Sequence, residues 1–169
     1  RIVKIFVFIG LLYSWNTVNL YSQMVKVPLE QLSISSRTVI KGTVLKKWSE
    51  YETDGKNIVT FITFSVSETI KGDQKDNVTI VILGGVVGNV GMGVSHTPKF
   101  RIGEEVVVFI SNDYKGRATV TDWEQGKFSV INGSVFYESK EVDTKEFVRA
   151  LRDFVTQKEQ GVIQINAKN

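Results

Sequence analysis

The chain of 169 residues contains no cysteine and a single histidine. Without cysteine it has no disulfide, no thiol nucleophile and no acceptor for a lipid anchor. A zinc site built by the protein needs three or four cysteine, histidine or carboxylate ligands, and His96 can supply only one. No Gly-x-Ser-x-Gly motif is present to position a serine nucleophile. These absences predict a protein that is not an enzyme and that uses no metal or cofactor.

The chain also has little excess charge of either sign. It has 21 Lys and Arg residues and 18 Asp and Glu residues. If the N-terminal segment that contains Arg1 and Lys4 is cleaved off, 19 basic and 18 acidic residues remain, a net charge of +1. Such a balance lacks the basic surface that binds a phosphate backbone, so we expect no nucleic-acid partner.

Residues 1–22 have the three-part pattern of a secretory signal peptide. Arg1 and Lys4 precede an apolar run from Ile5 to Leu12, and a more polar stretch ends at Ser22, the expected cleavage site. The run is far shorter than the roughly 20 residues that span a bilayer, so we expect no membrane span after cleavage. The pattern predicts a secreted or periplasmic protein, and the lack of cysteine favours a bacterial source.

Strand patterns dominate the rest of the chain. Over residues 58–70 apolar side chains alternate with threonine and serine, which predicts a long strand with one buried face. The β-branched run Thr38–Trp48, with a bulge at Gly42, predicts a neighbouring strand that forms a hairpin with it. The pair Asn132-Gly133 predicts a type I′ turn in a last hairpin.

Two helical segments flank these strands. Pro28 starts a short turn over residues 28–32, and Asp143 caps a C-terminal helix. The apolar face of that helix is formed by Phe147, Leu151, Phe154 and Val155. We expect a mainly β fold, a small OB-like antiparallel barrel of five to seven strands with a C-terminal α-helix. Residues 23–160 are predicted to form one domain, and residues 161–169 a loosely ordered tail.

Several segments resemble the start of netrin-like modules, which include the tissue inhibitors of metalloproteinases. These segments are Leu29-Glu-Gln-Leu32, Val39-Ile-Lys-Gly-Thr-Val44 and Ser67-Glu-Thr-Ile-Lys-Gly72. Phe100–Ile110 and Gln125–Phe128 are more similar to small exported bacterial proteins of unknown function. The likeness covers residues 29–131 and implies an OB-type barrel that binds a protein, with a protease among the candidates.

The inhibitory mechanism of those relatives does not carry over. The inhibitors chelate the zinc of the protease through an N-terminal cysteine, and this chain has none. Gln23, at the expected mature end, can cyclise and lose its amine. The resemblance therefore implies binding through a different surface.

A glycine-rich stretch over residues 84–98 carries the predicted partner-binding residues. Its glycine spacing matches neither the dinucleotide-binding motif nor the P-loop. Loops on a rigid β scaffold often carry function, and exposed apolar residues often mark a partner site. The predicted contact residues are Gly85, Val86, Val87, Val90, Met92, Val94 and His96. The same stretch also fits a plain connection between strands, with its valines buried against the barrel.

These patterns lead us to expect an exported, monomeric, non-catalytic module that binds another exported protein. The alternative is a β-barrel that binds a small molecule or a glycan by stacking it on Trp48, Tyr51 and Trp123. The same aromatic residues also fit a role in the core.

Overall fold

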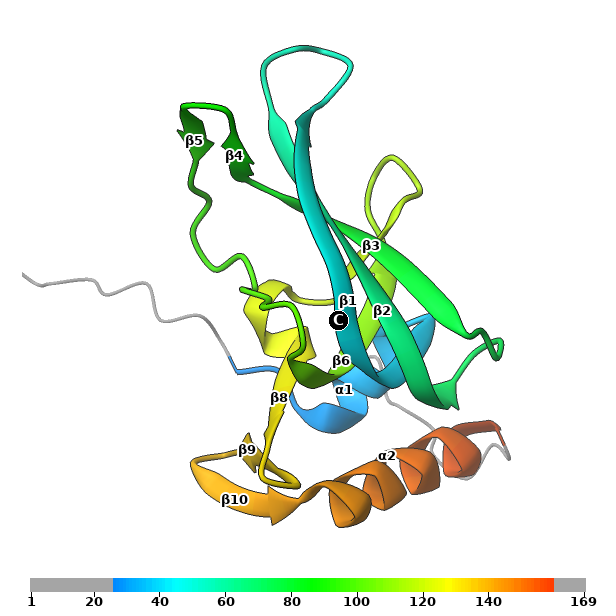
Figure 1. Cartoon of the computed structure of the whole chain (residues 1–169). Coiled ribbons are helices and arrows are strands. Elements are labelled where there is room, and N and C mark those ends of the chain that lie inside the picture. The colour runs from blue at the N-terminus through cyan, green and yellow to red at the C-terminus, as the bar shows by residue number, and fades with distance from the viewer. Residues whose placement is uncertain (1–25, 160–169) are drawn as a thin grey trace, which may run out of the picture.

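The computed structural model describes residues 26–159 (Figure 1). The predicted signal peptide and the predicted tail at residues 161–169 lie outside the described residues. The elements are α1 (Leu29–Ser35), β1 (Thr38–Tyr51), β2 (Ile58–Lys71), β3 (Asn77–Leu83), β4 (Gly85–Val87), β5 (Val90–Met92), β6 (Glu105–Asn112), β7 (Ala118–Val120), the 3-10 helix η1 (Trp123–Gly126), β8 (Lys127–Ile131), β9 (Ser134–Tyr137), β10 (Lys140–Asp143) and α2 (Thr144–Glu159). The expected mainly β fold with a C-terminal helix is confirmed.

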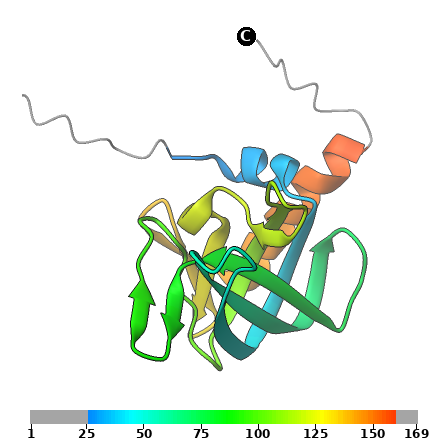
Figure 2. The same ribbon diagram turned by 90° about the horizontal axis from the view of Figure 1, so that it is seen from above.

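One antiparallel sheet organises the fold, with the strand order β10-β9-β8-β6-β1-β2-β3. β6 forks this sheet, because two strands share the edge of β6 that lies opposite β1. Val106, Val107 and Val108 pair with β8, whereas the stretch from Ile110 to Asn112 pairs with β7. One branch curls back towards β3, and the other carries β9, β10 and α2 (Figures 1 and 2).

The fork gives the sheet a core on each face. Inside the curl, the buried residues are Ile40, Val44, Ile62, Phe64, Ile80, Phe100, Val106, Val108, Ile110 and Val120. On the opposite face, under α1 and α2, they are Leu29, Leu32, Val39, Ile70, Val107, Phe109, Val135, Phe147, Val148 and Leu151. The second core confirms that the helix following Asp143 packs its apolar face on the sheet.

Three local predictions are confirmed. The ladder between β1 and β2 shifts register between Lys41 and Gly42, as expected for a bulge. Asn132 (φ 52°) and Gly133 (φ 80°) both have positive φ in the turn between β8 and β9, as a type I′ turn requires. Asp143 Oδ1 accepts hydrogen bonds from the first-turn amides of α2, at 2.8 Å from Lys145 N and 3.2 Å from Glu146 N.

The predicted OB-like barrel does not close. β3 and β7 lie side by side, but within residues 26–159 no hydrogen-bonded ladder joins them. β7 is only three residues long, because Asp122 (φ 50°) and Trp123 (φ 58°) adopt left-handed conformations that turn the chain into η1. The sheet therefore stays open along a seam between β3 and β7. The described residues form ten strands, whereas the sequence predicted five to seven.

Candidate functional site

The glycine-rich stretch after β3 forms a hairpin instead of a plain connection. Within it Gly85, Val86 and Val87 of β4 face Met92, Gly91 and Val90 of β5 in an antiparallel ladder. Over residues 26–159 the two strands pair only with each other, as a separate two-stranded sheet. Both views show this hairpin standing apart from the main sheet (Figures 1 and 2).

The base of this hairpin is held against β2 by three hydrogen bonds. Gly84 N donates to Ile58 O at 2.7 Å, and Thr60 Oγ1 donates to Gly84 O at 2.6 Å. On the other strand, Met92 Sδ accepts a hydrogen bond from Ile58 N at 3.3 Å. A Cβ atom on Gly85, whose φ is 145°, would overlap Thr60 Oγ1. The hairpin therefore leaves the sheet in a fixed direction.

The tip of the hairpin exposes apolar side chains. Val86 is 65% exposed and Val90 is 51% exposed. In the ladder Val90 lies opposite Val87, whereas Val86 lies opposite Gly91, so Val86 and Val90 point to opposite faces. Of the other predicted contact residues, Val87, Met92 and Val94 are partly buried. The tip is therefore apolar on both of its faces.

His96 lies beyond the hairpin and contacts a different part of the fold. Its Nδ1 atom lies 3.1 Å from Glu124 Oε1, and its carbonyl oxygen accepts a hydrogen bond from Glu124 N at 3.0 Å. These contacts fasten the segment after β5 to η1. The structure thus separates His96 from the exposed valines with which the sequence grouped it.

The aromatic residues of the alternative function fall in separate places. Trp48 stacks on Phe61 of β2, with ring centroids 5.1 Å apart, and Lys46 Nζ lies 4.7 Å from the Trp48 ring centroid. Tyr51 is exposed at the end of β1. Trp123 instead lies in η1 and lines a cleft that Trp48 does not reach.

That cleft opens along the seam between β3 and β7 and has a volume of about 420 Å³. Leu83 from β3 and Thr119 from β7 form its walls, and Tyr114 and Trp123 line it with aromatic rings. Both aromatic residues are at least half exposed. Because β7 ends after three residues, the missing strand pairing leaves this hollow in the surface.

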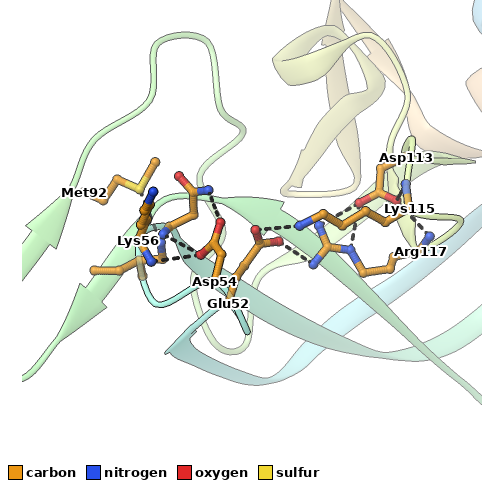
Figure 3. Close-up of polar contacts among 9 residues, drawn as sticks. Glu52, Asp54, Lys56, Met92, Asp113, Lys115 and Arg117 are labelled. Carbon is orange, nitrogen blue, oxygen red and sulfur yellow. Dashed lines mark hydrogen bonds and ion pairs between the residues drawn. The ribbon is translucent and has the colours of Figure 1, made fainter.

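A buried carboxylate supports one end of the cleft (Figure 3). The Glu52 side chain is only 4% exposed, and its two oxygens accept hydrogen bonds from Lys115 Nζ and Arg117 Nη1, each at 2.7 Å. Asp113 Oδ2 accepts a further bond from Arg117 Nε at 2.8 Å. The hydrogen bond from Lys115 is the main reason that the Glu52 pKa lies below its usual value, with further lowering by Arg117 against the effect of burial. This network fixes the turn between β6 and β7 on the end of β1.

Sequence reasoning missed this network, although a signal for the turn was present. The run from Asn112 to Gly116 predicts a turn, but nothing in it points to Glu52 as the partner of Lys115.

No known protein family matches the chain, and no curated protein is recognisably similar to it. The resemblance to netrin-like modules therefore stays a prediction.

Over residues 26–159, no three His, Asp or Glu side chains lie close enough to hold a metal ion. In the same part of the chain, no helix is both long and apolar enough to cross a membrane. The tip of the hairpin and the cleft along β3 and β7 are two candidate binding surfaces of residues 26–159.

Proposed function

We propose that this protein is an exported, non-catalytic module that binds another protein through the β4–β5 hairpin. The observation that carries the proposal is a hairpin with a fixed base and with apolar side chains on both faces of its tip. The signal-peptide pattern of residues 1–22 supports export, and the partner would then be exported too.

The geometry favours insertion of the tip into a groove of the partner. A flat partner surface would cover either Val86 or Val90, because the two side chains point to opposite faces. A groove would cover both, and burial of an exposed valine side chain contributes about 1.5–3 kcal/mol. The anchored base also lowers the entropy lost on binding, because the hairpin is already held in one direction.

Replacing both exposed valines by threonine tests this proposal. The double variant Val86→Thr/Val90→Thr keeps the β-branched shape and the strand preference of each residue, but places a hydroxyl group in the interface. We expect a partner retained by the wild-type protein to bind the double variant at least about tenfold more weakly, the equivalent of 1.4 kcal/mol. The measurement is a pull-down from the exported fraction, followed by calorimetry with the purified partner.

Ile102→Thr is the matched control, because Ile102 is another exposed aliphatic residue but lies in the loop before β6. This variant should bind the partner as the wild type does, and all variants should keep the same melting temperature. Equal loss of binding in both variants, or unchanged binding in the double variant, would show that the hairpin is not the contact surface.

A further inference from the structure

We propose that the cleft along the β3–β7 seam is a second binding site, which takes a neutral saccharide independently of the hairpin. Its volume of about 420 Å³ lies in the lower part of the range that holds small ligands in proteins. The chemical class of the ligand follows from three features of the lining: exposed aromatic rings, two acceptor groups that make no hydrogen bond within residues 26–159, and the balance of charge.

The aromatic rings provide the apolar part of the site. Trp123 is 50% exposed, and Tyr114 is more exposed still, although both line the same cleft. The cation of Lys115 lies 5.4 Å from the Tyr114 ring centroid and favours one placement of that ring. A sugar ring has one face of C–H groups that packs on an aromatic face, so the two rings suit a saccharide.

The polar lining contains two acceptor groups that make no hydrogen bond within residues 26–159. Within residues 26–159 the Asp122 carboxylate makes no hydrogen bond, and the Asn57 Oδ1 atom makes none either. Asn57 Nδ2 is already engaged, since it donates to Asp54 Oδ2 at 2.9 Å. A ligand that fits these two groups donates hydrogen bonds to them, as the hydroxyl groups of a sugar do.

The charges of the lining disfavour an anionic ligand. Glu52 and Asp113 already hold Arg117 between them, with Lys115 as a second cation on Glu52. The uncompensated charge that remains is the carboxylate of Asp122. A phosphate or a uronic acid would be repelled by it, whereas a neutral sugar would not.

The backbone beside the cleft is strained in a way that fits a ligand site. Trp123 has a φ of 58°, which is rare for a bulky side chain, and it follows Asp122 with a φ of 50°. The contact of Glu124 N with His96 O at 3.0 Å holds this corner in place. Strained residues persist where their surroundings force them, and such places include ligand clamps. Here the two strained residues supply the Trp123 ring and the Asp122 carboxylate to the cleft.

Titration of the purified ¹⁵N-labelled protein with sugars tests the proposal. The probes are the neutral trisaccharides maltotriose, cellotriose, chitotriose and mannotriose, with trigalacturonate as the anionic comparison. The readout is the indole N–H resonance of Trp123, assigned with the variant Trp123→Phe. We expect at least one neutral probe to shift it at up to about 10 mM, which would fill even a millimolar site. Trigalacturonate should bind at least about tenfold more weakly, because of Asp122.

Trp123→Gly separates binding from stability. Glycine adopts a positive φ without strain, which offsets part of the stability lost with the half-buried ring, so this variant should stay folded. Its affinity for the sugar should fall at least about tenfold, because the stacking ring is lost. Tyr114→Ala should weaken binding in the same direction without unfolding the protein, since Tyr114 is largely exposed.

Trp48→Phe is the control, because Trp48 stacks on Phe61 outside the cleft, and it should leave the affinity unchanged. The proposal is overturned if no neutral probe shifts Trp123, if trigalacturonate binds as tightly, or if Trp123→Gly and Tyr114→Ala both keep full affinity.

Discussion

Replacing Gly42 by alanine is expected to destabilise the fold by about 3 kcal/mol, near the upper end of the effect of overpacking. A Cβ atom at this position would overlap the carbonyl oxygen of Ser65 on β2 and would lie 3.3 Å from Val66 Cα. β1 cannot move away, because Gly42 also pairs with Val106 of β6 on its other side. Both neighbours are backbone in a buried sheet, so relief requires the ladder itself to shift.

Thermal unfolding followed by circular dichroism measures this effect, with an expected fall in melting temperature of about 10 °C. Gly91→Ala is the matched control, since the nearest atom to a Cβ at Gly91 is Val86 Cγ2 at 3.8 Å, an ordinary contact. Gly91→Ala should have the same melting temperature as the wild type. A Gly42→Ala variant that also melts with the wild type would mean that the bulge is not tightly packed.

Replacing Glu52 by glutamine is expected to cost about 2 kcal/mol of folding free energy at neutral pH. Removing one partner of a fully buried ion pair costs about 3–5 kcal/mol. The effect is smaller here because the side chains of Lys115 and Arg117 are 36% and 33% exposed, so water can solvate them after the change. Urea unfolding provides the measurement. Glu50→Gln, an exposed change near the end of β1, is the control and should leave the midpoint unchanged.

The folding stabilities of the wild type and of Glu52→Gln should depend differently on pH. The folded-state pKa of Glu52 lies below the ordinary value of 4.5, chiefly because of the hydrogen bond from Lys115. The stability that this carboxylate contributes is therefore present above about pH 4.5 and is lost as the pH falls through the folded-state pKa. We expect the difference between the wild type and Glu52→Gln to shrink on going to about pH 3. A difference that stays constant would contradict a charged Glu52 in the folded protein.

The elements that the sequence predicted correctly are those set by local patterns. Alternation over residues 58–70 defines β2, because the side-chain period of a strand is two. The turn at Asn132-Gly133 and the cap at Asp143 depend on one or two residues each. Closure of the barrel depends instead on whether β3 meets β7 edge to edge. No local pattern encodes that pairing, and the left-handed backbone at Asp122 and Trp123 prevents it.

The candidate site was predictable only in part, because some of its contacts join segments that are far apart in the sequence. The apolar residues Val86 and Val90 stand out in the sequence, and the structure shows that they are exposed. Their hairpin was missed because glycine-rich strands are short and carry weak strand preference. The support of the cleft was missed because Glu52 lies 63 and 65 residues from its partners, Lys115 and Arg117.

The fork at β6 has a consequence for how the protein unfolds. Val107 and Phe109 belong to the core under the helices, whereas Val106 and Val108 belong to the core inside the curl. Successive residues of β6 therefore contribute side chains to two different cores. If either core unfolds, β6 loses its packing and the other core loses part of its side chains. The sheet and its helices should therefore unfold in a single cooperative transition, and a weakened core on either face should lower the stability of both.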